Sequence, residues 1–237
     1  MKHNKKFAFT LAEVLITLGV VGVIAAITLP SLIRNYQVQV LKAQFEVADS
    51  IIQQAVKKTC LELGVDTLND YRIYNYRPSD ATPMAERVAL VNSVWLKQFT
   101  QISPISRMAY FGKGNDMFGE KMNDMRIPYY SNDYFYILPS GVLISPFQNA
   151  SGGMTMMFDT NGPKKGPNRL GHDIFVYNSF NYNIPQNPGY YGLCNPTVTH
   201  SQNQNGCWDW AHRNINPKNN QKGYWEILFK PRSWWDE

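Results

Sequence analysis

The sequence predicts an α+β fold in which one long N-terminal helix packs on a small antiparallel sheet. The apolar segment 9–29 continues past Pro30 into a run with apolar residues three and four positions apart, which is typical of an amphipathic helix. Later in the chain, short β-rich runs alternate with turn residues, as in an antiparallel sheet. The chain after residue 178 is rich in Asn, Pro, Gly and Tyr, so we expect a loop-rich C-terminal region.

The apolar segment is long enough to cross a membrane. As a helix, residues 9–29 extend about 32 Å, and the hydrocarbon core of a bilayer is about 30 Å thick. Lys2, Lys5 and Lys6 precede the segment, and its only formal charge is Glu13. The positive-inside rule therefore places the N-terminus in the cytoplasm and everything after Pro30 outside.

Glu13 needs a partner, because a carboxylate within a membrane helix costs about 2.5–3.5 kcal/mol on insertion scales. The apolar segment contains no basic residue that could neutralise it. Cleavage between Ala8 and Phe9 would create a new ammonium group four residues before Glu13, on the same helix face or on a neighbouring helix.

These features resemble a known processing signal. A basic leader and the small residue Ala8 are followed by an apolar run that ends near Pro30 and begins Phe9-Thr10-Leu11-Ala12-Glu13-Val14-Leu15. The pattern is similar to the type IV prepilin signal shared by pilins and the pseudopilins of type II secretion. It covers only residues 1–30, and Ala8 stands where the family nearly always has glycine.

The resemblance implies a pilin-like fold and a structural role rather than an enzymatic one. A prepilin peptidase would cut after Ala8 and methylate the amine of Phe9. The mature helix would anchor the chain in the bacterial inner membrane and later form the core of a type II secretion or type IV pilus filament. Glu13 would then pair with the amine of a neighbouring subunit. The implied partners are the peptidase, further copies and other pilin or pseudopilin subunits, and the assembly platform of the inner membrane.

An ordinary secretory signal peptide is the alternative interpretation. Cleavage near Ala25-Ala26 would release an exported soluble binding protein or enzyme. Glu13 inside the apolar segment and the absence of a break after it favour the prepilin interpretation.

The predicted organisation has four parts: a leader (1–8), a transmembrane segment (9–30), the soluble half of the spine helix (31–58) and a periplasmic or extracellular domain (59–237). The formal net charge is +5, but three positive charges belong to the leader, so the remaining chain carries +2. This charge does not indicate nucleic-acid binding.

We expect a second helix to begin at Thr82-Pro83. One face of it should be buried and carries Val88, Val91, Trp95 and Phe99. About four strands should form the sheet, and one further strand should lie near the C-terminus. The predicted strands are 134–138, 142–145, 154–158 and 174–177, with the further strand at 224–229.

The stretch from Asp159 to Asp173 contains Asp-x-Asn-Gly, then Gly-Pro-Asn, and a closing Asp. It resembles a loop common in pseudopilins, which binds calcium in the major subunit of the secretion machine. Asp159, Asn161 and Asp173 carry the oxygen ligands that calcium prefers. The alternative, which we favour, is that the two Asp side chains only cap turns, since Lys164, Lys165 and Arg169 lower the affinity for a cation. Calcium is the one cofactor that the sequence suggests.

The chain has three cysteines, Cys60, Cys194 and Cys207. Pilins often carry a disulfide in the C-terminal region, and Cys194 with Cys207 would close such a loop. A zinc set of Cys194, His200, Cys207 and His212 is the alternative, but its spacing matches no common zinc pattern. Cys60 is then expected to be a buried thiol at the end of the spine helix.

No hydrolase, zinc-protease or phosphate-loop motif occurs in the sequence. The aromatic residues of the tail could stack on sugars or bases, but packing is the favoured role. Trp234 and Trp235 are candidate interface residues.

Overall fold

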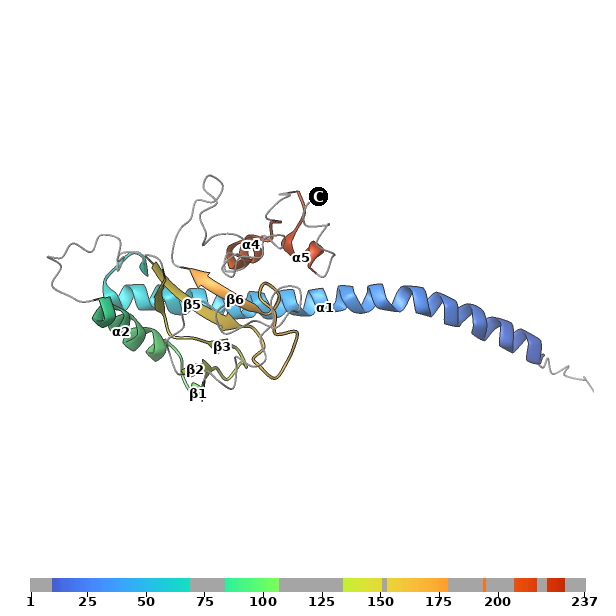
Figure 1. Cartoon of the computed structure of the whole chain (residues 1–237), viewed down its shortest axis with the longest axis horizontal. Helices are drawn as coiled ribbons and strands as arrows, with labels where there is room; N and C mark the ends of the chain where they lie inside the picture. Colours follow the sequence, from blue (N-terminus) through green and yellow to red (C-terminus); the bar gives the residue numbers. More distant parts are fainter. Residues whose placement is uncertain are drawn as a thin grey trace, which may run out of the picture. The chain divides into compact units, whose positions relative to one another are not determined.

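The structure is a computed structural model of the chain, and it describes residues 10–68, 84–106, 134–150, 153–178, 194, 207–216 and 221–228. The chain divides into two compact units, Met1–Val40 and Leu41–Glu237. Helix α1 (Leu11–Leu63) is the long helix in Figure 1, and it runs without a break through both units. The predicted long helix is therefore confirmed, and it ends at Leu63 rather than at residue 58.

Pro30 lies inside α1, where it removes one backbone N–H donor. Nearby hydroxyl groups bind backbone carbonyls of the same turns. Thr28 Oγ1 donates to the carbonyl of Ile24 at 2.9 Å, and Ser31 Oγ donates to the carbonyl of Thr28 at 2.8 Å. Side-chain bonds of this kind are one way in which an apolar helix tolerates an internal proline.

The buried face of α1 begins at Leu41, within the second unit. Its buried apolar residues recur every three or four positions, as predicted: Leu41, Phe45, Ala48, Ile52, Ala55 and Val56. Phe45 contacts Phe158 and Phe175, with ring centroids 6.2 and 4.6 Å apart. This part of the helix therefore packs directly on the sheet.

The predicted second helix is present as α2 (Met84–Trp95), followed by the short 3-10 helix η2 (Leu96–Gln98). Val91 and Trp95 are completely buried, and Phe99 stacks edge-on against Trp95. The predicted start at Thr82-Pro83 lies outside the described residues.

In the part of the chain that the structure describes, the sheet has six strands, and all their pairings are antiparallel. They are β1 (Ser103–Ser106), β2 (Tyr134–Ile137), β3 (Leu143–Ile144), β4 (Gln148–Ala150), β5 (Gly153–Asp159) and β6 (Ile174–Asn178). β1 pairs with β2, β2 with β3, and β3 with β5. β4 and β6 also pair with β5. The predicted hairpin and the two strands after it are found, whereas β1 and β4 were not predicted.

A bulge separates β3 from β4. Ile144 lies opposite Phe158 and Gln148 opposite Thr155, so the three residues 145–147 face the two residues 156–157. Pro146 cannot donate to the ladder, and beside it the Ser145 hydroxyl accepts the Met157 N–H at 2.8 Å. The side chain of Asn92 binds both the N–H and the carbonyl of Phe147, at 2.6 and 2.8 Å. Helix α2 is thereby attached to the bulge.

Both faces of the sheet are apolar, which explains why β5 reads as a nearly continuous hydrophobic run. One face carries Phe158 and Phe175, which pair across β5 and β6 and contact α1. The other face carries a separate buried cluster of Phe135, Leu143, Met157, Leu170, Ile174 and Val176.

The prediction of a strand at 224–229 is wrong, because Tyr224–Ile227 forms a short helix, α5. Tertiary contacts override the β-propensity of its aromatic residues. Tyr224 is completely buried, and the Trp225 ring packs 5.3 Å from that of Phe45. A further helix, α4 (Cys207–Arg213), lies in the region for which only loops were expected.

Candidate functional site

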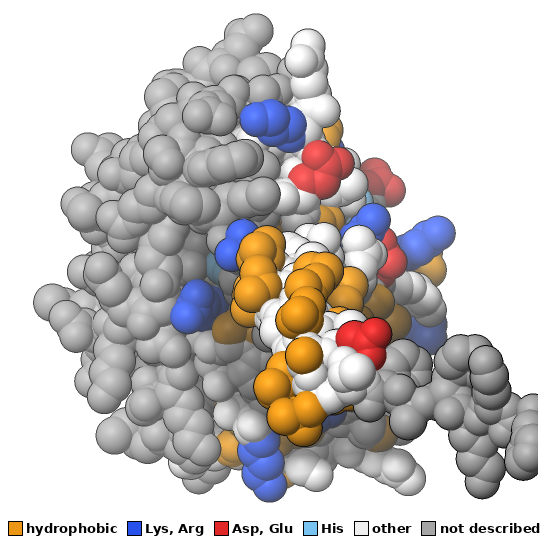
Figure 2. Space-filling view, turned by 90° about the vertical axis from the view of Figure 1, so that its right-hand side faces the viewer, with side chains coloured by type: hydrophobic (Ala, Val, Ile, Leu, Met, Phe, Trp, Pro, Cys, Tyr) orange, Lys and Arg blue, Asp and Glu red, His pale blue; other side chains and the backbone are white. Residues whose placement is uncertain are grey.

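The N-terminal part of α1 presents an apolar surface. Large hydrophobic side chains are exposed on every side from Leu11 to Ile33, with Leu11 81% and Ile27 73% exposed. Figure 2 shows these side chains gathered over this part of the helix. A helix of twenty residues is about 30 Å long, the thickness of a bilayer core. This part of α1 is therefore long and apolar enough to cross a membrane.

Thr10 and Glu13 cap the N-terminus of this helix. The Glu13 Oε2 atom accepts bonds from the Thr10 N–H and hydroxyl, both at 2.8 Å, and the Glu13 N–H donates to Thr10 Oγ1 at 3.2 Å. This reciprocal arrangement is a capping box. The Thr-x-x-Glu spacing could have revealed it in the sequence, which we interpreted only through the charge of Glu13. The predicted cleavage residues Ala8 and Phe9 lie outside the described residues.

The loop from Asp159 to Asp173 joins β5 to β6, and both acidic side chains are completely buried. Asp159 Oδ1 accepts the N–H groups of Asn161 and Gly162, at 3.0 and 2.8 Å. The two oxygens of Asp173 accept the N–H groups of Asn168 and Arg169, both at 2.7 Å. The turn-capping role that we favoured from the sequence is thus present in the hydrogen bonds of the loop.

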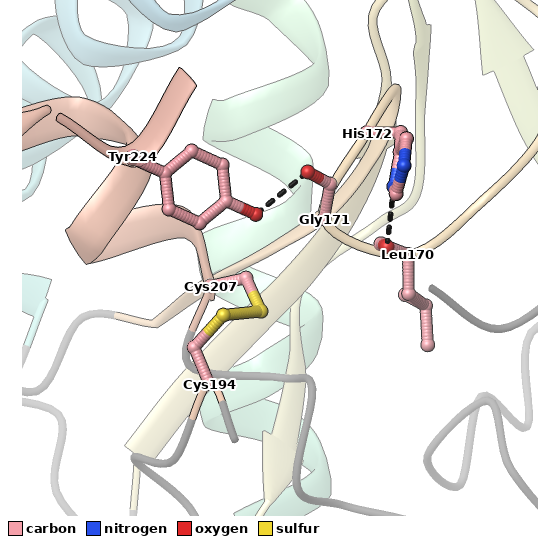
Figure 3. Close-up of a disulfide and its surroundings, with 6 residues drawn as sticks. All are labelled: Leu170, Gly171, His172, Cys194, Cys207 and Tyr224. Carbon is pink, nitrogen blue, oxygen red and sulfur yellow. Dashed lines mark hydrogen bonds between the residues drawn. A yellow bond between two sulfur atoms is a disulfide. The ribbon is translucent and has the colours of Figure 1, made fainter. Parts of the chain in front are cut away.

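Burial shifts the titration of two neighbouring residues in this loop. It raises the pKa of Asp173 to about 6, against the opposing effect of the hydrogen bonds from Arg169 and Asn168. It lowers the pKa of His172 to about 3, because a charged imidazole would lose its hydration there. His172 is therefore neutral at physiological pH, with Nδ1 3.4 Å from the carbonyl of Leu170 (Figure 3).

The calcium assignment for Asp159, Asn161 and Asp173 stays a prediction, and the loop's donors match it poorly. Within the described residues, no group of three His, Cys, Asp or Glu side chains lies close enough to hold a metal ion. The buried loop oxygens without a hydrogen-bond partner all belong to neutral groups: Thr160 Oγ1, Asn161 Oδ1 and Asn168 Oδ1. Such oxygens can complete a calcium site, but calcium affinity depends on the number of charged ligands.

A disulfide closes a loop within the C-terminal region and a tyrosine joins this region to the 159–173 loop, both shown in Figure 3. Cys194 and Cys207 are bonded, which removes them from the zinc set considered above. The Tyr224 hydroxyl donates to the carbonyl of Gly171 at 2.6 Å, which ties α5 to the loop. Cys60 is a buried thiol that forms no disulfide, as expected.

Asp49 on α1 is a buried carboxylate that sequence analysis did not single out. Its oxygens bind two side chains of α4, Trp208 Nε1 and His212 Nδ1, both at 2.7 Å. The two rings stack on each other, and Tyr177 packs edge-on against Trp208. An acidic residue on the buried stripe of α1 was the available signal, because a buried charge requires partners.

Comparisons with known protein families, with curated proteins and with solved structures find no match to this chain.

Proposed function

We propose that this protein is a pilin-like structural subunit, a pseudopilin or minor pilin of a type II secretion or type IV pilus filament. In this proposal a prepilin peptidase cuts after Ala8, Phe9 is methylated, and the first part of α1 is retained. The observation that carries the proposal is the uncovered apolar helix surface from Leu11 to Ile33, which includes a single carboxylate, Glu13.

The free energy of burying apolar side chains favours a state in which lipid or protein covers this surface. Burying one large aliphatic side chain stabilises by about 1.5–3 kcal/mol, and the exposed side chains follow one another along the whole helix start. Lipid would cover them in the membrane, and the helices of other subunits would cover them in a filament. The domain from Leu41 onward would then lie in the periplasm or outside the cell.

Glu13 has a different partner in each state of this proposal. In the single chain its carboxylate binds Thr10, so its hydrogen bonds are satisfied without another subunit. In the filament it would pair with the amine of a neighbouring Phe9, which neutralises two charges in a medium of low dielectric constant.

The mass of the mature N-terminus tests the proposal. The protein is expressed with a prepilin peptidase, purified from the membrane fraction and digested, and its N-terminal peptide is measured. We expect a peptide that begins with methylated Phe9. A chain that begins near Ala26 or Ile27 and is recovered in soluble form would instead support an exported binding protein or enzyme.

A further inference from the structure

The side-chain amide of Asn161 lies between oxygen atoms from three parts of the chain. Its nitrogen donates to Gln44 Oε1 on α1 at 3.1 Å and lies 3.5 Å from the carbonyl oxygen of Gly166. The Asn161 side chain also acts on the Asp173 carboxyl, whose pKa it lowers as a hydrogen-bond donor. An amide oxygen, a backbone carbonyl and a carboxylate are the ligand types that surround calcium in proteins. Here they surround an N–H donor.

The acidic groups of the loop already have partners. Both oxygens of Asp173 accept backbone N–H groups, and Asp159 Oδ1 accepts two. A metal ion at this place would have to share these oxygens with the amides that define the turns. It would also displace the Asn161 nitrogen from Gln44 and Gly166.

The charge of the loop also opposes a cation. Residues 159–173 contain two carboxylates and three basic side chains, Lys164, Lys165 and Arg169, so their net charge is +1. His172 adds no charge near neutral pH, because burial lowers its pKa to about 3. Calcium sites of useful affinity place several carboxylates around the ion. This loop has two, Asp159 and Asp173.

We propose that the loop is closed by hydrogen bonds instead of a metal ion and that Asn161 determines this. Its side-chain nitrogen takes the place of a cation between Gln44, Gly166 and Asp173, and it joins the loop to α1. A carboxylate at position 161 converts the loop into a calcium site. The unpartnered oxygens of Thr160 and Asn168 are then available as neutral ligands.

Thermal unfolding of the full-length protein in detergent tests this inference. The melting temperature is measured in calcium and in EGTA, with magnesium at matched ionic strength as the salt control. We expect the wild-type protein to melt at the same temperature in all three buffers. A wild-type melting temperature that calcium raises, and that Asp173→Ala makes independent of calcium, would overturn the proposal.

Asn161→Asp is the informative variant, because it removes the N–H donor and adds a third carboxylate. It should melt below wild type in EGTA, rise in calcium and bind terbium with sensitised luminescence. Folding of this variant only when calcium is present would also support the proposal. If it folds and shows neither a calcium shift nor terbium binding, position 161 does not set the specificity.

Asn161→Ala is the matched control, since it removes the donor without adding charge. It should melt below wild type by the same amount in calcium and in EGTA. A calcium response in this variant would show that the ligands lie elsewhere in the loop, contrary to the proposal. If Asn161→Ala does not fold, Gln44→Ala removes the same hydrogen bond from the side of α1. It should likewise melt below wild type by the same amount in calcium and in EGTA.

Discussion

The Glu13 carboxylate combines a local role with the proposed intermolecular one. We predict that Glu13→Ala inserts into the membrane at least as well as wild type, because the change removes a cost of about 2.5–3.5 kcal/mol. Filament assembly or secretion should be lost. Membrane fractionation and electron microscopy of sheared filaments measure the two effects.

Glu13→Gln separates the two roles of this residue. Glutamine can still accept the hydrogen bonds from Thr10 that cap the helix, but it carries no charge. If the intersubunit charge pair matters, Glu13→Gln should fail to assemble just as Glu13→Ala does. Normal filaments from either variant would contradict the charge role.

His172 and Asp173 should give the domain an unusual dependence on pH. The pKa of His172 falls to about 3 on folding, so its stabilising contribution is present above pH 6.5 and is lost as the pH falls. The pKa of Asp173 rises to about 6, so its contribution is present below pH 3.8 and is lost as the pH rises through 6. Between about pH 6 and pH 4 the two effects cancel.

We predict that Asp173→Asn removes this cancellation. As the pH falls through this range, the free energy of unfolding of the variant should decrease relative to that of wild type by about 1.4 kcal/mol for each pH unit. Urea unfolding at a series of pH values in EGTA measures the difference in slope. Equal slopes for wild type and variant would mean that Asp173 does not take up a proton near pH 6 in the folded state.

Single residues show where sequence reasoning succeeds and where it stops. The turn-capping roles of Asp159 and Asp173 and the pairing of Cys194 with Cys207 could be predicted, because local patterns and a family resemblance point to them. The Asp49 network could not, since Trp208 and His212 are about 160 positions away along the chain, at separations of 159 and 163. Such contacts exist only after the helix and the C-terminal segment have met.

At the scale of elements, the docking of α4 on α1 depends on Asp49. We predict that Asp49→Ala destabilises the domain by about 1–3 kcal/mol, because it leaves the N–H groups of Trp208 and His212 without their acceptor. Thermal unfolding and tryptophan fluorescence measure this change. Glu46→Ala is the control on the same helix. The Glu46 side chain is 62% exposed and pairs only loosely with Lys42, so its loss should change stability by less than about 0.5 kcal/mol.

The disulfide holds the start of α4 to Cys194, which is 13 residues earlier in the chain. In the chain-entropy model a loop of this size stabilises by about 3 kcal/mol. We predict that Cys194→Ser lowers the free energy of unfolding by about that amount, and that a reductant then has no further effect on the variant. An unchanged melting temperature would show that Asp49 and Tyr224 hold the segment without the covalent bond.

Elements with strong local patterns were predicted well, and elements that depend on distant partners were not. Helix α1 and strands β2, β3, β5 and β6 have clear periodicity or turn signals. Strand β4 exists because the bulge at 145–147 returns the chain to β5, which no propensity indicates. Helix α5 replaced a predicted strand because its rings pack on Phe45 and reach Gly171.

At the scale of the whole molecule, α1 has an exposed apolar part and a buried part along one helix. Its continuous run of exposed large apolar residues extends from Leu11 to Ile33, and its first buried residue is Leu41. The four residues 37–40 contain no charge, and the compact second unit starts directly after them. An exposed apolar helix and a folded domain are thus separate requirements on one continuous sequence.

We predict that a chain beginning at Gln37 is a soluble monomer with an intact domain. All buried residues of α1 remain in it, so the packing of Phe45 on the sheet is retained, while the exposed apolar surface from Leu11 to Ile33 is removed. Its melting temperature should match that of the full-length chain in detergent, and gel filtration should give one monomeric peak. Aggregation, or a clearly lower melting temperature, would show that the domain needs the first part of α1 for its stability.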